Sequence, residues 1–182
     1  MITQFFIFAA VFIVFSYVVF RKVVRRDYLQ RQKLSPLSYI LETLVFAGHV
    51  NALYLILPTP WPGMPELPDD PMVTLVAGGL FSLGLILLLI AWFGLGTKTS
   101  FGQDKNKLQT GGLYHYSRNP QLVAYGIFLT SLVILFFSWL SVVWFALYIV
   151  ASYFMVQSEE EFLAQQYGAE YETYCQAVPR IV

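Results

Sequence analysis

Charged side chains are scarce in this 182-residue sequence, where Asp, Glu, Lys and Arg together make up 12% of the residues. A soluble domain carries about 25% charged residues, so this composition argues against a soluble protein. Because 57% of the residues are hydrophobic, the sequence indicates an integral membrane protein. The eleven basic and eleven acidic residues cancel, and the net charge therefore identifies no partner.

Cysteine and histidine are also scarce. Cys175 is the single cysteine, which excludes an intramolecular disulfide and leaves the redox compartment open. With only His49 and His115 as imidazole donors, no transition-metal site is expected. A serine nucleophile has no support, since no G-x-S-x-G motif occurs. The first apolar run has no charged segment before it, so a cleaved signal is not expected.

Long apolar runs are abundant instead. A helix that spans a bilayer needs about 20 apolar residues, with a usual range of about 17–25. Five runs reach or approach this length, and they predict an all-α, polytopic membrane protein with a single membrane domain over residues 1–182. A polar tail, residues 157–182, is expected to form a cytoplasmic amphipathic helix. The five expected spans are residues 5–20, 37–57, 72–95, 121–137 and 140–156.

The connections between the runs predict how the spans are arranged. Pro58–Pro71 contains six prolines and is expected to be non-helical, whereas Ser138 and Trp139 alone separate the last two runs and predict a tight hairpin. Six Lys or Arg residues lie in the first loop, four in the third, one in the tail and none in Pro58–Pro71. The positive-inside rule then places the N-terminus outside and the tail in the cytoplasm. If the short first run lay in the interface, four spans would remain and the N-terminus would be cytoplasmic.

Polar and small residues interrupt two of the runs. Gly78 and Ser82 are four residues apart in the third run, a spacing that predicts close helix packing in lipid. Glu42 and His49 are two helical turns apart and share a face of the second run. They indicate either a functional site, such as a proton relay or a site for a substrate headgroup, or two residues with separate structural roles. In the second interpretation, which we favour, Glu42 pairs with a basic residue and His49 hydrogen-bonds a neighbouring helix.

The stretch Leu108–Gly126 joins a polar loop to an apolar run. Asn119 is typical of a helix N-cap and Pro120 of the first helical position, so a helix is expected to begin here. A helix N-terminus offers unpaired N–H groups and partial positive charge, and Arg118 immediately precedes it. Tyr114 adds a ring with a polar tip. The stretch therefore predicts a site that receives an anion at the edge of the membrane.

The polar tail carries an apolar stripe at helical spacing, which Gly168 is expected to divide into two short helices. Glu159 and Glu160 lie on the same side as the stripe, whereas Glu161 points elsewhere. Inward carboxylates need cationic partners, and Arg118 is the nearest candidate in the predicted topology. The stripe comprises Leu163, Tyr167, Tyr171, Tyr174 and Val178.

A zwitterionic ligand would match these two features. Its carboxylate would face Arg118 and the helix N-terminus, and its cation would face Glu159 and Glu160. S-adenosylmethionine has an amino-acid end, a sulfonium and a flat adenine suited to aromatic stacking. It is compatible with the pattern, as many other zwitterions are.

The two motifs together also resemble a known family. GGLYHYSRNPQLVAYG (residues 111–126) and EEEFLAQQYGAEYETYCQAVPR (residues 159–180) are similar to the paired motifs of the isoprenylcysteine carboxyl methyltransferase and phospholipid methyltransferase family of integral membrane enzymes. Members typically show G-P-Y-x-x-x-R-H-P-x-Y-x-G, a helical hairpin, and E-E-x-x-L…F-G-x-x-Y-x-x-Y…V-P-R. The likeness covers residues 108–180. This chain departs from the pattern at Leu113, Asn119, Leu122 and Ala124, where the family has Pro, His, Tyr and Gly.

The resemblance implies methyl transfer from S-adenosylmethionine at the cytoplasmic face, with Arg118 and Glu160 as the catalytic residues. It implies a lipophilic or small-molecule substrate that enters from the membrane: an isoprenylcysteine-like carboxylate, a phospholipid amine or a thiol. Membrane lipids are the other expected partners, and no nucleic acid is expected. The implied cofactor-binding residues are Tyr114, Arg118, Asn119 and Pro120 on one wall, Glu159 and Glu160 on the other, and Tyr171, Tyr174 and Arg180 as a lid.

Two other functions stay open at this point. One is an NADPH-dependent membrane reductase, because sterol reductases resemble this chain in the layout of the C-terminal part. NADPH would favour several basic residues for its phosphates, whereas Arg180 is the only Lys or Arg after Arg118. The other is a non-catalytic membrane protein that retains the fold.

Overall fold

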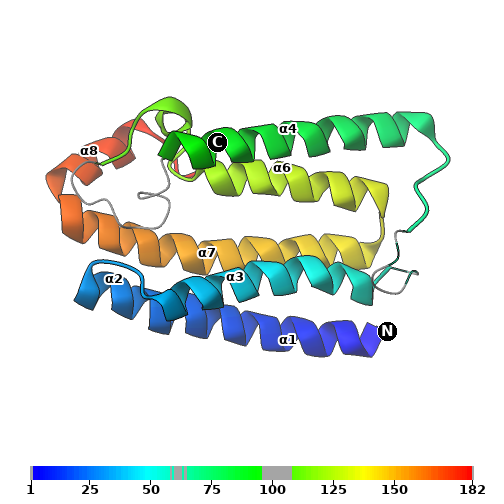
Figure 1. Ribbon diagram of the computed structural model, residues 1–182, viewed down its shortest axis with the longest axis horizontal. Helices are drawn as coiled ribbons and strands as arrows, with labels where there is room; N and C mark the ends of the chain where they lie inside the picture. Colours follow the sequence, from blue (N-terminus) through cyan, green and yellow to red (C-terminus); the bar gives the residue numbers. More distant parts are fainter. Residues whose placement is uncertain (1, 58, 60–62, 64, 96–107, 182) are drawn as a thin grey trace.

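The computed structural model describes residues 2–57, 59, 63, 65–95 and 108–181, and within these ranges every regular element is helical (Figure 1). This confirms the all-α fold. Of the long helices, α7 is central: α1 and α3 pack on one side of it and α6 on the other, and α4 lies on the far side of α6 (Figure 1). The elements are α1 (Ile2–Val18), η1 (Val19–Val24), α2 (Arg25–Arg31), α3 (Pro36–Asn51), η2 (Ala52–Leu55), α4 (Pro71–Leu95), η3 (Gly112–His115), α6 (Pro120–Leu135), α7 (Trp139–Tyr167) and α8 (Ala169–Ala177).

Three helical stretches are long and apolar enough to cross a membrane: Ile2–Arg31, Pro71–Phe93 and Trp139–Tyr167. They coincide with the first, third and fifth expected spans and indicate a membrane protein. α6 is apolar but has 16 residues, and α3 also has 16 residues because it gives way to a 3₁₀ turn after Asn51. The count of five spans therefore stays a prediction.

The first helix opens into a π-helix at η1 before it continues as α2. At this point the Phe20 carbonyl accepts a hydrogen bond from the Ser158 hydroxyl of α7 at 2.9 Å. Beside it, the Arg21 and Arg25 guanidinium groups both reach the Glu161 carboxylate, at 2.6 and 2.5 Å. The first helix is thus held on α7 by polar contacts, and Glu161 points away from the tail stripe, as expected.

His49 has the structural role that we favoured. Its Nε2 lies 2.9 Å from the Trp144 carbonyl, and the Trp144 indole N–H donates to the His49 carbonyl at 2.7 Å. The two rings are stacked with centroids 4.6 Å apart. Within the described part of the chain Glu42 makes no ion pair, so its predicted basic partner is not found there. The lysines of the loop after α4 lie outside the described residues.

α4 and α6 approach each other closely at Gly84. A Cβ atom at Gly84 would lie 2.5 Å from the Phe128 backbone nitrogen and 2.9 Å from the Ala124 carbonyl oxygen. The predicted packing pair Gly78 and Ser82 is wrong, because both residues are exposed and a Cβ at Gly78 meets no atom within 4 Å. α4 is apolar on all sides, so the sequence does not reveal which face packs.

The predicted hairpin between α6 and α7 is confirmed. Ser138 caps α7, because its hydroxyl oxygen accepts a hydrogen bond from the Ser141 backbone N–H. In return, the Ser138 backbone N–H donates to the Ser141 hydroxyl oxygen. The tail is not a separate element at its start: α7 runs unbroken for 29 residues through Tyr167. It ends at Gly168, which adopts a φ of +51° that favours glycine, and α8 follows. The predicted break at Gly168 is therefore confirmed.

Candidate active site

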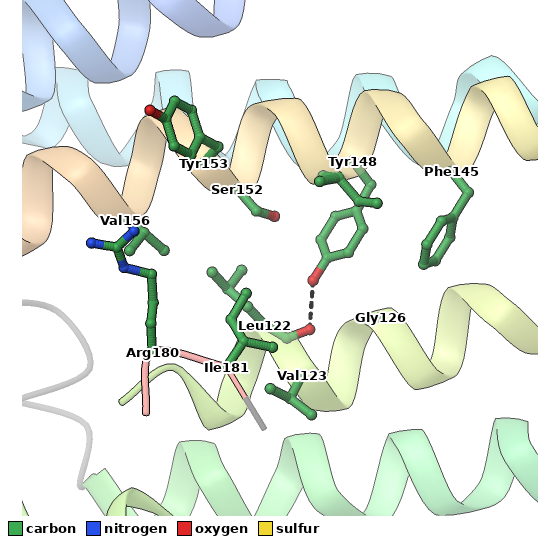
Figure 2. Close-up of a pocket in the computed structure, with 11 residues that line it drawn as sticks. Leu122, Val123, Gly126, Phe145, Tyr148, Ser152, Tyr153, Val156, Arg180 and Ile181 are labelled. Atoms are coloured by element: carbon green, nitrogen blue, oxygen red, sulfur yellow. Dashed lines mark hydrogen bonds between the residues drawn. The ribbon is translucent and has the colours of Figure 1, made fainter. Parts of the chain in front are cut away.

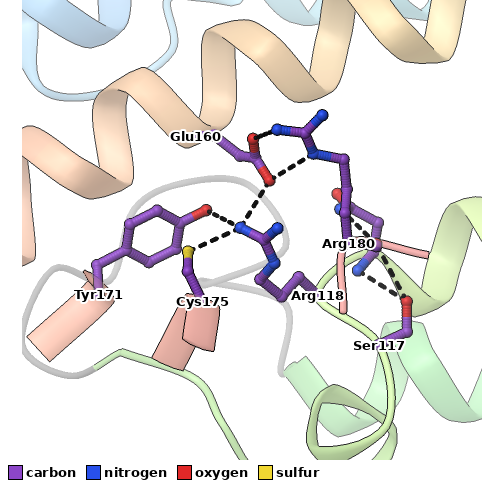
Figure 3. A network of polar contacts seen from close by, with 7 residues as sticks. Ser117, Arg118, Glu160, Tyr171, Cys175 and Arg180 are labelled. Atoms are coloured by element: carbon purple, nitrogen blue, oxygen red, sulfur yellow. Dashed lines mark hydrogen bonds and ion pairs between the residues drawn. The ribbon is translucent and has the colours of Figure 1, made fainter. Parts of the chain in front are cut away.

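The expected site residues other than Glu159 meet at one end of the bundle, where α6 begins and α7 ends. There η3, α8 and residues 178–181 close around the two helix ends (Figure 3). We call residues 178–181 the C-terminal strap. α8 packs on the loop before α6 through a small apolar cluster of Leu108, Tyr171, Tyr174 and Val178. This cluster brings the apolar stripe of the tail against the predicted anion site.

Glu160 on α7 is the centre of the polar network. Its carboxylate lies 2.9 Å from Arg118 Nη1, and it accepts from Arg180 Nε and Nη2 at 3.0 and 2.5 Å (Figure 3). The predicted pairing of the inward carboxylate with Arg118 is confirmed for Glu160. The bond to Glu160 also raises the pKa of Arg180, so this guanidinium stays charged. One carboxylate between two guanidinium groups leaves the cluster with a formal charge of +1 (−1 + 2).

Arg118 is held by several groups, and its Nε has no partner among the described residues. Its Nη1 lies 3.4 Å from the Tyr171 hydroxyl and 2.7 Å from the Cys175 sulfur. Only 14% of its side chain is exposed, and among the described residues no group accepts from its buried Nε. Burial and the nearby Glu160 raise the pKa of Tyr171, while Arg118 opposes that shift. The Tyr171 phenol is thus neutral, and its hydroxyl faces the Arg118 guanidinium.

Tyr114 and Tyr174 connect η3 to α8. The Tyr174 hydroxyl donates to the Tyr114 carbonyl at 2.6 Å. Burial raises the pKa of Tyr174 to about 12, and burial together with Glu159 raises the pKa of Tyr114. Both phenols are neutral at physiological pH, and the Tyr174 hydroxyl is already engaged. These residues supply rings to the site rather than acids or bases.

Asn119 and Pro120 begin α6 as expected, but Asn119 does not cap it through its side chain. The amide instead donates to the Arg180 carbonyl at 3.0 Å, because the strap crosses the helix start at this point. The Ser117 hydroxyl lies 3.3 Å from the same carbonyl oxygen, and the Arg118 N–H donates to the Pro179 carbonyl at 3.0 Å. The predicted capping role of Asn119 is replaced by a contact with the strap.

Glu159 lies apart from the two arginines. Its half-buried carboxylate interacts electrostatically with Tyr114 and with Glu42 of α3, and no ion pair with Arg118 or Arg180 is formed. Glu161 thus faces the first helix and Glu160 faces the site. The expectation that Glu159 shares a cationic partner with Glu160 is not met among the described residues.

A largely apolar cavity of about 350 Å³ lies between α6 and α7 and reaches the strap (Figure 2). Arg180 and Ile181 stand at one end of it and Phe145 at the other. We call this cavity the groove between α6 and α7. The sequence predicted neither the groove nor the contact of Cys175 with Arg118. The four-residue spacing of Cys175 from Tyr171 indicates a shared helix face, whereas no local signal marks the groove. The remaining lining residues are Leu122, Val123, Gly126, Tyr148, Ile149, Ser152, Tyr153 and Val156.

The family model described as phospholipid methyltransferase matches residues 72–170 of the chain. The match extends from α4 through the start of α8 and includes Arg118 and Glu160. Comparison with curated proteins and with solved structures gave no match.

Proposed function

Because the chain belongs to the phospholipid methyltransferase family, we propose that it transfers a methyl group from S-adenosylmethionine to a lipophilic or small acceptor at the cytoplasmic face of a membrane. Membership of this family implies a membrane methyltransferase. The acceptor would be a carboxylate like that of isoprenylcysteine, a phospholipid amine or a thiol, and it would enter from the surrounding lipid.

The charge of the Arg118–Glu160–Arg180 cluster is the observation that carries the proposal. A net positive cluster with the buried Arg118 Nε unpartnered among the described residues fits a carboxylate, such as the one on the amino-acid end of S-adenosylmethionine. Glu160 would hold the ammonium or the sulfonium of the same molecule by exchanging its contact with Arg180 for it. The rings of Tyr171 and Tyr114 fit a flat adenine. The residues present therefore match the parts of this cofactor.

The groove between α6 and α7 fits the apolar part of the acceptor. Its lining is almost wholly apolar, so an acyl or prenyl chain would replace lipid there at little cost. The groove ends at Arg180, whose guanidinium also bonds Glu160. An acceptor in the groove would thus bring its polar end to the charged cluster. Arg118 and Glu160 would hold the cofactor and Arg180 would stand between the two ligands.

S-adenosylmethionine supplies a methyl group on a positively charged sulfur, which is reactive without further activation. The residues then contribute positioning and electrostatics, which carry most of the rate in such a transfer. A carboxylate or thiolate acceptor needs no general base. Both carboxylate oxygens of Glu160 already accept from guanidinium groups, so neither is free to take a proton from the acceptor. An amine acceptor would have to lose its proton to another group.

The arrangement of the basic segments supports the proposed orientation, with the N-terminus outside and the tail cytoplasmic. Arg21 and Arg25 from the first loop bind Glu161, while Arg118 from the third loop binds Glu160. The two basic loops and the tail thus meet at one end of the bundle, as both the five-span topology and the four-span alternative require. Placing that end in the cytoplasm follows the positive-inside rule.

Two adjacent glutamates give a matched test. We expect Glu160→Gln to weaken S-adenosylmethionine binding at least about 30-fold, because truncating a buried charge-assisted contact costs about 2 kcal/mol or more. Glu161→Gln removes the same charge from the next residue but faces Arg21 and Arg25, so its affinity should stay within about threefold of the wild type. Arg118→Ala should behave like Glu160→Gln.

The measurement is calorimetric titration of the detergent-solubilised protein with S-adenosylmethionine and, separately, with NADPH. Full binding of S-adenosylmethionine to Glu160→Gln and Arg118→Ala would refute the site. Binding of NADPH by the wild type would support the reductase. A wild type that binds neither ligand would support a non-catalytic protein with this fold.

A further inference from the structure

The C-terminal strap is held at the site by its backbone. The Arg180 carbonyl oxygen receives the Asn119 side-chain N–H at 3.0 Å and lies 3.3 Å from the Ser117 hydroxyl. One residue earlier, the Pro179 carbonyl accepts from the Arg118 backbone N–H at 3.0 Å. Three consecutive residues before α6 thus bond two consecutive carbonyls of the strap, more than 60 residues later in the chain. The Asn119 side chain could instead cap α6, and it does not.

We propose that Ser117 and Asn119 form a latch on the Arg180 carbonyl, and that Asn119 is thereby a positioning residue that sets where the Arg180 guanidinium and the Ile181 side chain stand. The Arg180 side chain then reaches Glu160 with both Nε and Nη2, a two-point contact that requires a fixed backbone. Ile181 stands in the lining of the groove between α6 and α7. The latch therefore fixes the second cation on Glu160 and the end wall of the groove together.

The latch depends on the side-chain N–H of Asn119 as a hydrogen-bond donor, and it involves no acid–base chemistry. Asn has an amide donor in a place similar to that of the Nδ1 atom of histidine, so Asn119→His can keep the contact. Asn119→Asp has the same shape but presents carboxylate oxygens to a carbonyl oxygen, which repels the strap. The set Asn119→His, Asn119→Asp and Asn119→Ala thus separates donation from size. Ser117→Ala removes the second contact, together with the hydroxyl that accepts from the Asn119 backbone N–H at 3.2 Å.

Trypsin reports the latch directly, because it cuts after Arg180 at the very carbonyl that Ser117 and Asn119 hold. We would follow cleavage of the Arg180–Ile181 bond by mass spectrometry in the full-length protein in detergent. Cleavage after Lys33, in the turn between α2 and α3, is the internal reference. Relative to this reference, Asn119→Asp and Asn119→Ala should raise the rate at least about fivefold, the effect of losing one hydrogen bond of ordinary strength. Asn119→His should restore the wild-type ratio.

The second readout is the affinity for S-adenosylmethionine, and only this arm rests on the proposed function. This affinity should be lower in Asn119→Asp than in the wild type and equal to the wild type in Asn119→His. The unfolding temperatures of the variants should stay equal. If the wild type binds no S-adenosylmethionine, the proposed function fails and the proteolysis still tests the latch. Equal cleavage ratios in the wild type, Asn119→Asp and Ser117→Ala would overturn the latch. If Asn119→Asp does not fold, the comparison of Ser117→Ala with the wild type decides.

Discussion

Gly84 is where a single added methyl group should do the most damage to the fold. In Gly84→Ala the new Cβ would lie 2.5 Å from the Phe128 nitrogen and 2.8 Å from its Cα, where ordinary contact begins at 3.4 Å. These neighbours are backbone atoms of α6, so no side chain can rotate out of the way. α4 and α6 must separate by about 1 Å, which loses dispersion contacts along the whole interface.

The size of the effect follows from this geometry. Overpacking of a tight interface costs about 1–3 kcal/mol, and the upper half of that range applies because the clash is with backbone. The interface that separates includes Ala77 and Ala91, both almost fully buried on α4, one two-turn step from Gly84 on either side. We therefore expect Gly84→Ala to lower the free energy of unfolding by about 2–3 kcal/mol.

Gly78→Ala is the matched control on the same helix. A Cβ at Gly78 meets no atom within 4 Å, so this change adds the same methyl group in open space. It should leave stability unchanged or raise it by up to about 1 kcal/mol through helix propensity. Reversible unfolding in mixed detergent micelles, followed by circular dichroism, measures both variants. A Gly84→Ala protein within about 0.5 kcal/mol of Gly78→Ala would refute the close approach of α4 to α6.

Two further predictions concern the hairpin and the aromatic contacts of the site. Ser138→Ala removes the cap of α7 and should lower the free energy of unfolding by about 1 kcal/mol in the same assay. Ser138→Asp can still cap the helix and should keep most of the wild-type stability. Because the pKa of Tyr174 is raised from 10.0 to about 12, its contribution to stability is complete below pH 10 and is lost as the pH rises through 12. The absorbance difference at about 295 nm between wild type and Tyr174→Phe should therefore titrate near pH 12, and a midpoint near 10 would contradict the buried contact.

Local signals predicted the elements that frame the site. Asn119–Pro120 marked the start of α6, Ser138 the turn into α7, and Gly168 the end of α7, because each residue type has a strong preference for one backbone position. The spacing of Glu160 and Glu161 also placed them on different faces of the helix, and their arginine partners confirm that separation. These features depend on the chain within a few residues of each position.

Contacts between distant segments were not predictable in the same way. α4 is apolar on every face, so nothing in its sequence distinguishes the packed Gly84 from the exposed Gly78. The second cation on Glu160 comes from Arg180, twenty residues further on, and depends on the strap folding back across Asn119. Sequence reasoning gave Asn119 a local capping role because it weighs near neighbours only. The strap offered a distant acceptor instead.

The unbroken length of α7 would tie the proposed chemistry to the thickness of the bilayer. Trp139 and Glu160 are 21 residues apart on one helix (160 − 139), which separates them by about 32 Å along its axis. The hydrocarbon core of a typical bilayer is about 30 Å thick. If α7 crosses the bilayer as proposed and Trp139 lies at one interface, Glu160 would lie at the other, where the surroundings change from lipid to water over a few ångströms. A thicker bilayer would draw the charged cluster into a less polar medium and strengthen its electrostatic interactions. A thinner bilayer would expose the cluster to water and weaken these interactions.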